Sequence, residues 1–345
     1  MSSQNYSLLT VSFVIALLVG VGLMNLGIDP YAQYGTGFVR PVVQESRLTK
    51  LRLFEELPDG PQGVVLGSSR VHKFDPEVLQ INTGNRFFNF GVNHGRPEDF
   101  LALYRHLRKQ SSTVPSMLLI GVDPISLSDA EEVDARLLGI NELSGQIREY
   151  LTWEDRAKRW SDLLSWNQTK NSLHALKSLA RHTESPAEES FREDGLIQYH
   201  RREVEIANGE YDFEAALSYN IDEYTTYYRR VTGLSEARCD CLREVISTAR
   251  SEGTEVVLFL PTLHPRLLES LNQIEGAEPF RERCRGFLEQ LAQTNAIPLY
   301  DFTELTSFNG QAAQFVDGIH PLEPNTKKMI DIMFPLTVED RYALQ

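Results

Sequence analysis

The stretch Gly63-Val64-Val65-Leu66-Gly67-Ser68-Ser69-Arg70 (residues 63–70) contains the signal from which the fold can be read. The turn cluster PDGPQ at 58–62 precedes a short apolar run, and small polar residues end that run. A short apolar run between turn residues is typical of a buried strand of a parallel sheet, whose carboxyl end opens into a loop. We therefore predict a strand at 63–66, with Ser69 in the loop that follows it.

The same pattern recurs along the chain. Further strands are expected at 86–91, 117–121, 255–260 and 297–302, and helices at 97–109, 236–251 and 279–294. Strands that alternate with helices predict a parallel sheet with helices on both faces. The predicted fold class is therefore α/β, with a doubly wound, mostly parallel five-stranded sheet.

The alternation stops between Asp123 and about Leu234, where the chain is polar and mostly helical in period. We interpret 126–234 as a helical insertion between two parts of one α/β domain, 60–125 and 235–345. Insertions at the carboxyl ends of parallel strands lie above the sheet, where ligands bind. Two interpretations stay open: a cap that recognises substrate, or an elaboration that faces solvent.

The amino-terminal segment differs in composition from the rest. From Tyr6 to Ile28 there is no charged side chain, and the first acid is Asp29. Such a run reaches roughly the 30 Å thickness of the hydrocarbon layer as a helix, so we predict a transmembrane anchor at 1–28 and a juxtamembrane stalk or helix at 29–59. A buried core helix and a cleaved signal peptide are the alternatives. The long apolar run and the lack of basic residues before it favour a retained anchor.

The orientation of this helix is weakly encoded. No Lys or Arg precedes it, whereas Arg40 and Arg47 follow it, which by charge alone favours a cytoplasmic carboxyl-terminal part.

Composition excludes several classes of protein. The 48 acidic and 34 basic residues give a formal net charge of −14, which argues against a general nucleic-acid binder. With 41% hydrophobic and 24% charged residues, the chain is of ordinary globular composition. Three cysteines are too few for a disulfide framework, although Cys239 or Cys241 could pair with Cys284 in an oxidising compartment. No metal-binding pattern is present, and we expect no cofactor.

Four segments at predicted strand ends or at the start of the last helix carry polar residues. They are 67–70 (GSSR), 89–95 (NFGVNHG), 121–124 (GVDP) and 317–321 (DGIHP). In a doubly wound sheet these segments converge on one edge. A nucleophilic Ser needs a base, and the base needs an orienting group, so Ser69, His320 and Asp317 form a candidate catalytic triad. An ordinary turn with a Ser N-cap is the simpler interpretation of Gly-Ser-Ser by itself.

These segments resemble the conserved blocks of the SGNH (GDSL-like) hydrolases over roughly 60–125 and 254–335. VVLGSS is similar to the first block, with Ser69 as nucleophile and Ser68 where Asp is usual. NFGVNHG and LLIGVDP resemble the second and third blocks, and DGIHP resembles the block that closes the triad. With an anchor and a long insertion, the chain is similar to the membrane-anchored branch associated with cell-envelope polysaccharide modification, such as alginate acetylation and lipoteichoic acid D-alanylation proteins.

The resemblance implies an oxyanion site with two departures. In the second block a Gly offers its backbone N–H, and here the position is His94, or Gly95 if the alignment slips by one. The third block presents an Asn side chain, and here Asp123 takes its place. An ionised carboxylate cannot donate a hydrogen bond to an oxyanion. Either Asp123 is protonated, or Asn93 replaces it as donor, or activity is impaired.

Three further residues are candidates for the same edge. Arg70 could bind an anionic glycan or acyl donor, although an Arg at a helix start is more often a surface residue. His264 follows the strand at 255–260 and could bind substrate or serve as a structural loop residue. His72 lies close to Ser69 in sequence and is a weaker candidate.

The sequence therefore predicts an anchored SGNH-like serine esterase or O-acyltransferase. The resemblance implies acyl, chiefly acetyl, esters of a cell-envelope or exported polysaccharide as substrate, a soluble domain outside the cytoplasm, and a membrane-bound acyltransferase as a partner. On grounds of resemblance this orientation replaces the one that charge alone favours. The alternative is a catalytically silent protein of the same fold that binds glycan or acts as a scaffold in an acyl-transfer complex.

Overall fold

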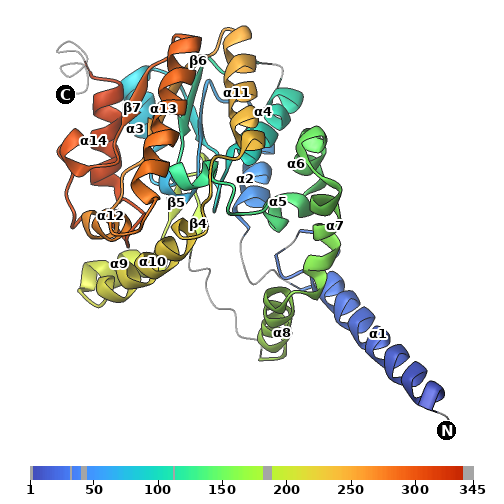
Figure 1. The fold of residues 1–345 in the computed structure, drawn as a ribbon. Coiled ribbons are helices and arrows are strands. Elements are labelled where there is room, and N and C mark those ends of the chain that lie inside the picture. Colours follow the sequence, from blue (N-terminus) through green and yellow to red (C-terminus); the bar gives the residue numbers. More distant parts are fainter. Residues whose placement is uncertain (1–2, 32, 40–44, 112, 182–188, 337–345) are drawn as a thin grey trace. The chain divides into compact units, whose positions relative to one another are not determined.

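The computed structural model describes residues 3–31, 33–39, 45–111, 113–181 and 189–336 (Figure 1). Arg40 lies outside these ranges. The chain forms two compact units. The helical unit comprises Met1–Leu48 and Val133–Ala187, and the sheet unit comprises Thr49–Glu132 and Glu188–Gln345.

The sheet unit is built on five parallel strands in the order β2-β1-β3-β6-β7. The strands are β1 (Gly63–Leu66), β2 (Phe87–Asn89), β3 (Met117–Gly121), β6 (Glu255–Leu260) and β7 (Leu299–Asp301). The predicted α/β class and five-stranded parallel sheet are confirmed. Strands β2 and β7 are shorter than the predicted 86–91 and 297–302. The chain passes from β1 to β2 on one side and then returns to β3 on the other, so the order reverses beside β1, where doubly wound folds bind ligands.

Helices cover both faces of the sheet. On one face α3 (Pro76–Thr83) and α14 (Glu323–Met333) pack against every second strand residue, including Val65, Leu119 and Val257. Successive side chains of a strand point to opposite faces. The other face is covered by α4 (Pro97–Gln110) and α11 (Glu236–Ser251), with α13 (Ala277–Asn295) beside α11 and α2 (Ser46–Glu55) earlier in the chain. Helices α4, α11 and α13 match the predicted ranges within a few residues.

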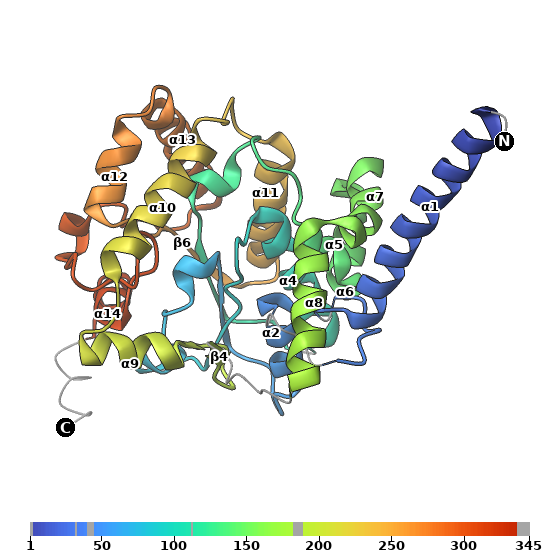
Figure 2. The ribbon, with the colours of Figure 1, turned by 90° about the horizontal axis from the view of Figure 1, so that it is seen from below.

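The sheet unit also contains the last part of the predicted insertion. It forms a small antiparallel hairpin, β4 (Ser190–Phe191) and β5 (Ile197–Gln198), and the helices α9 (His200–Asn208) and α10 (Phe213–Tyr228). Helix α10 packs along α12 (Pro265–Asn272), as Figure 2 shows. Short 3₁₀ turns follow three strands: η1 (Ser69–Val71), η2 (Pro124–Leu127) and η5 (Leu305–Phe308).

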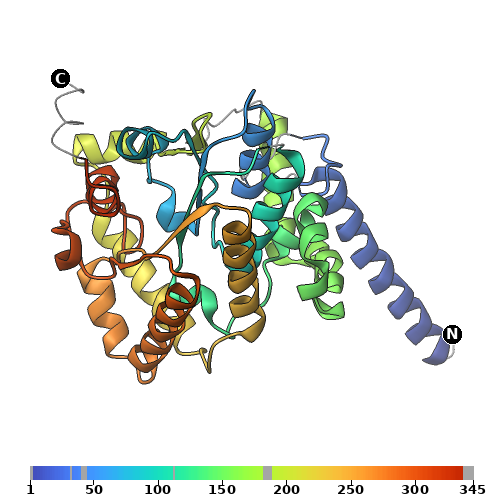
Figure 3. The ribbon, with the colours of Figure 1, turned by 90° about the horizontal axis from the view of Figure 1, so that it is seen from above.

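The helical unit contains α1 (Ser3–Ile28) and a set of shorter helices. These are α5 (Ala135–Gly139), α6 (Asn141–Ser144), η3 (Gly145–Tyr150), α7 (Trp153–Ser161), η4 (Asp162–Leu164) and α8 (Trp166–Arg181). Figure 3 shows α1 extending away from the short helices of its unit. Its segment Asn5–Ile28 has a mean hydropathy of 2.4 and is long and apolar enough to cross a membrane, as an anchor or a signal sequence would be.

The three cysteines lie in α11 and α13 of the sheet unit. Cys239, Cys241 and Cys284 are all free and buried, so the disulfide to Cys284 that their spacing allows is not formed. Burial raises the pKa of each thiol, that of Cys239 to about 11. These thiols are therefore part of the packed core.

Candidate active site

Ser69, His320 and Asp317 form a continuous hydrogen-bonded chain at the carboxyl edge of the sheet. Nε2 of His320 lies 2.8 Å from Oγ of Ser69, although the two residues are 251 positions apart. Nδ1 of His320 lies 2.7 Å from Oδ2 of Asp317. The imidazole and the serine are partly accessible, whereas Asp317 is buried. The structure thus brings together the three residues that the sequence nominated, in the order nucleophile, base, orienting group.

The segment 317–320 is folded around the Asp317 carboxylate. Its Oδ1 accepts hydrogen bonds from the backbone N–H groups of Ile319 and His320, each at 2.9 Å. Burial alone would raise the pKa of Asp317, but His320 and these two N–H groups outweigh it, and the pKa is lowered. Asp317 therefore stays ionised and accepts a hydrogen bond from the Nδ1–H of His320, which leaves Nε2 as the acceptor for the Ser69 hydroxyl.

Three glycines allow the Ser69 turn to approach the strand ends. A Cβ at Gly67, Gly91 or Gly121 would lie 2.5–2.7 Å from a methyl group of Val71, the last residue of η1. Any larger residue at these three strand ends would push η1 away from the sheet. The turn is fixed from its other end by Ser68, whose Oγ accepts the backbone N–H of Arg70 at 3.2 Å.

Asn89 joins the Ser69 turn to the segment 89–95. Its Nδ2 donates to the carbonyls of Val71 at 2.8 Å and of Phe74 at 3.0 Å. Its Oδ1 accepts from the Gly91 N–H at 2.9 Å and from Nζ of Lys50 at 3.3 Å. All of these contacts are buried. No role for Asn89 follows from the sequence, where its only signal is that a polar residue ends an otherwise apolar strand.

Asp123 is held in a buried ion pair with Arg70. The Arg70 guanidinium contacts Oδ1 of Asp123, and the Ser68 hydroxyl donates to Oδ2. The same guanidinium donates to the carbonyls of Pro261 and Thr262 at the end of β6. Both side chains are almost fully buried. Asp123 is therefore compensated by a fixed positive charge, and Arg70, expected as an anion-binding residue, is committed to internal partners.

His94, the first departure from the expected pattern, has a left-handed backbone conformation. His94 has φ +53°, a left-handed conformation that favours Gly and that His tolerates better than most residues. The N–H of Gly95 donates to the Val92 carbonyl at 3.0 Å, so this amide is occupied within its own turn. Asn93 is half-buried in the same loop. Within the described ranges the backbone N–H of Ser69 meets no acceptor, which leaves it available at the start of η1.

The two other histidine candidates have structural partners. Nδ1 of His264 caps α12 by accepting a hydrogen bond from the backbone N–H of Arg266 at 3.3 Å. The backbone N–H of His264 donates to the Gly318 carbonyl at 3.0 Å. His264 thus supports the segment that carries His320. His72 is buried, and its Nε2 lies 3.1 Å from the Gly91 carbonyl. Burial, with smaller effects of Lys50 and His320, lowers the pKa of His72 well below its usual value, so it is neutral.

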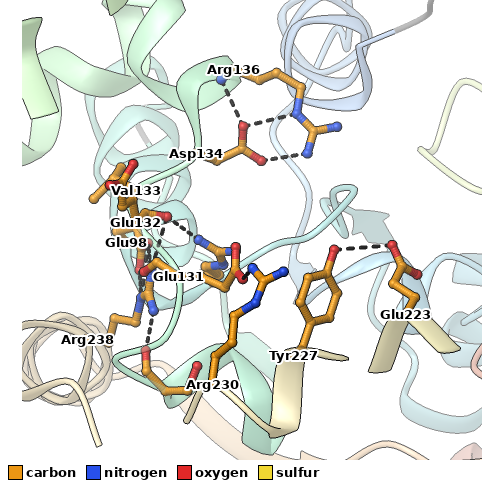
Figure 4. Close-up of polar contacts among 12 residues, drawn as sticks. Glu98, Glu131, Glu132, Val133, Asp134, Arg136, Glu223, Tyr227, Arg230 and Arg238 are labelled. Atoms are coloured by element: carbon orange, nitrogen blue, oxygen red, sulfur yellow. Dashed lines mark hydrogen bonds and ion pairs between the residues drawn. The ribbon is translucent and has the colours of Figure 1, made fainter. Parts of the chain in front are cut away.

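Helix α10 borders the triad. The Gly318 N–H donates to Oδ1 of Asn220 at 2.9 Å. One turn further along, Glu223 accepts from the Tyr227 hydroxyl at 3.2 Å, as Figure 4 shows. Burial raises the pKa of Glu223, whereas the Tyr227 hydroxyl and His320 lower it and Asp317 raises it. The insertion therefore contributes side chains to the surroundings of the site.

Figure 4 also shows how the loop after β3 is held. Arg238 of α11 pairs with Glu98 of α4 at 3.2 Å, and both side chains are buried. Arg238 also donates to the Glu131 carbonyl at 2.8 Å.

Within the described ranges no three His, Cys, Asp or Glu side chains are grouped so that they could hold a metal ion.

No known protein-family profile matches the chain, and no curated protein sequence matches it. Among solved structures, the chain is similar to the crystal structure of a "putative acylhydrolase" from Bacteroides fragilis NCTC 9343. The alignment covers 88% of this chain and 98% of that chain, with 13% sequence identity and a TM-score of 0.37.

Proposed function

We propose that the protein is a membrane-anchored serine esterase or O-acyltransferase. One observation carries the proposal: Oγ of Ser69, the His320 imidazole and the Asp317 carboxylate are joined by hydrogen bonds of 2.8 and 2.7 Å at the ligand-binding edge of a doubly wound sheet. A scaffold protein that had lost catalysis would have no need to keep both contacts. The geometry therefore favours the enzyme over the silent alternative.

In the first half-reaction, Ser69 attacks the carbonyl carbon of an ester while His320 takes its proton at Nε2. Asp317 stabilises the imidazolium that forms. The tetrahedral intermediate collapses to an acyl-serine when the alkoxide leaves and takes the proton from His320. The Ser69 N–H, at the start of η1, is suited to donate to the oxyanion.

In the second half-reaction, a hydroxyl group attacks the acyl-serine and His320 again acts first as base and then as acid. Water as acceptor gives an esterase, whereas a sugar hydroxyl gives an O-acyltransferase. Both share the first half-reaction. The proposals of acetyl groups, an envelope or exported polysaccharide, a membrane-bound acyltransferase partner and an extracytoplasmic domain rest on the sequence resemblance.

The test is hydrolysis of p-nitrophenyl acetate by the full chain in detergent, together with labelling by a fluorophosphonate. We expect wild type to react and Ser69→Ala and His320→Ala to lose turnover and labelling. Asp317→Asn should lower kcat on the order of 10⁴-fold, because it leaves His320 in the wrong tautomer. Ser251→Ala, an exposed serine in α11, is the matched control and should behave as wild type.

Peptide mapping distinguishes the outcomes. Fluorophosphonate on Ser69 with slow release of acid would indicate a transferase that excludes water, and adding a polysaccharide acceptor should then accelerate release of p-nitrophenol. If the wild-type protein showed no labelling and no turnover, the proposal would be overturned in favour of the scaffold.

A further inference from the structure

We propose that α7, η4 and α8 of the helical unit form a surface that lies in the anionic headgroup layer of the bilayer that α1 spans. The proposal goes beyond the catalytic function and rests on the membrane anchoring included in the proposed function. Four observations support it, all within the helical unit: the exposure of tryptophan, the local charge, the contacts with the last turns of α1, and a pocket that contains arginine.

The first observation is the exposure of every tryptophan in the chain. The chain has three, and all of them lie in α7 and α8. Their relative exposures are 74% for Trp153, 59% for Trp160 and 74% for Trp166. Tryptophan is usually buried in a soluble protein, and it is enriched at membrane–water interfaces, where the ring lies among headgroups. Three exposed tryptophans in one short segment therefore indicate a surface that is covered in the working protein.

The second observation is charge. Residues 153–181, from the start of α7 to the end of α8, contain six Lys or Arg and three acids, Glu154, Asp155 and Asp162, in a chain whose formal net charge is −14. On α8 the residues Trp166, Lys170, Leu173 and Lys177 are exposed and follow helical spacing, so they share one face. Buried Gln168, Ser172 and Ala175 occupy the opposite face. Cationic side chains interleaved with Trp and Leu are the pattern of a helix that lies on an anionic membrane.

The third observation fixes the depth of this surface. The apolar segment of α1 has 24 residues, about 36 Å as a helix, whereas the hydrocarbon layer is about 30 Å thick. The last turns of α1 therefore reach the headgroup level. There Nδ2 of Asn25 donates to the Leu163 carbonyl at 2.7 Å and to the Thr169 hydroxyl at 2.9 Å. These contacts hold η4 and the start of α8 at the level where α1 leaves the membrane.

The fourth observation is a pocket of about 270 Å³ between α5, α6, η3 and α7. Arg148, Arg156 and Trp160 line it beside the apolar side chains of Leu138 and Leu151. Two guanidinium groups suit a phosphate, and the apolar and aromatic walls suit the adjoining glycerol and first methylenes. The chemistry matches an anionic phospholipid of the bilayer that α1 spans.

The full chain, reconstituted into vesicles of phosphatidylcholine with or without phosphatidylglycerol, tests the proposal. Because all tryptophans lie in this surface, their fluorescence reports on it alone. With phosphatidylglycerol we expect strong quenching by lipids brominated near the headgroup end of the acyl chain, and protection from acrylamide. The variant Trp153→Phe/Trp160→Phe leaves Trp166 as the single reporter on α8.

Charge reversal provides the control. Lys170→Glu/Lys177→Glu should reduce the bromolipid quenching at least twofold in phosphatidylglycerol vesicles. Lys109→Glu/Lys327→Glu changes the net charge equally on exposed residues of the sheet unit and should leave the quenching unchanged. An equal effect of both pairs would overturn the proposal.

The remaining outcomes separate this proposal from the function it rests on. Failure of the chain to float with vesicles would overturn anchoring and surface together. Flotation without bromolipid quenching would overturn the surface alone. If the tryptophans were then also shielded from acrylamide, a protein partner and not lipid would cover them.

Discussion

The side chain of Asn220 accepts the backbone N–H of Gly318 at 2.9 Å, and this contact ties helix α10 to the segment that carries Asp317 and His320. Gly318 is buried, and a Cβ there would lie 3.1 Å from side-chain atoms of Leu217 and Asn220. The segment therefore has little freedom beneath α10. The position of His320, the proposed catalytic base, therefore depends on a residue from the middle of the chain.

Replacing Asn220 should impair both stability and catalysis. Asn220→Ala leaves a buried N–H without an acceptor, which costs about 1–3 kcal/mol of unfolding free energy. Displacement of His320 should lower kcat by up to about 10²-fold with less effect on KM, because His320 is proposed to act in the chemical step. Urea unfolding and ester hydrolysis measure the two effects. Asn208→Ala, exposed at the end of α9, is the control, and equal effects of both variants would contradict the assignment.

Replacing Asp123 should destabilise the fold. From sequence alone, Asp123→Asn would create the amide that the SGNH hydrolases, which the sequence resembles, present to the oxyanion. In the structure it leaves the buried Arg70 guanidinium without its counter-charge, so we expect a loss of about 3–5 kcal/mol. Thermal or urea unfolding measures the loss. The double variant Arg70→Met/Asp123→Asn should recover part of the lost unfolding free energy. If Asp123→Asn alone were as stable as wild type, the ion pair would not be formed.

The Asp317 carboxyl group should contribute stability that depends on pH. Its pKa is lowered in the folded protein, so its contribution is present above its unfolded pKa of about 3.9 and is lost as the pH falls through the folded value. The difference in unfolding free energy between wild type and Asp317→Asn should therefore be constant near neutral pH and shrink below about pH 4. A difference that grew on acidification would have the wrong sign for an ionised Asp317.

The three thiols should be unreactive in the folded protein. Cys239, Cys241 and Cys284 are buried with raised pKa values, and the thiolate is the reactive form. At about pH 8 we expect iodoacetamide to label none of them in the native chain and all three in denaturant, as measured by intact mass. Fewer than three labelled sites in denaturant without reductant would reveal a disulfide.

Much of the sheet unit could be predicted because its signals are local. The run 63–66 and the strand at 117–121 are apolar and bounded by turn residues, and both match β1 and β3 residue for residue. Helix boundaries followed from Pro at the first turn of α4 and from apolar spacing in α11. The predicted strands at the two sheet edges, 86–91 and 297–302, are longer than β2 and β7. A sequence pattern does not show where a neighbouring strand stops pairing.

The sequence by itself determined the order of strands, helices and turns and nominated Ser69, Asp317 and His320, since that order is written in hydrophobic pattern and turn chemistry. Only the tertiary structure decided what surrounds them. The Arg70–Asp123 pair spans 53 positions, and Asn220 lies 98 positions from Gly318. Such contacts depend on where the fold places distant side chains, and burial then fixes their charge and hydrogen bonding, which no local pattern encodes.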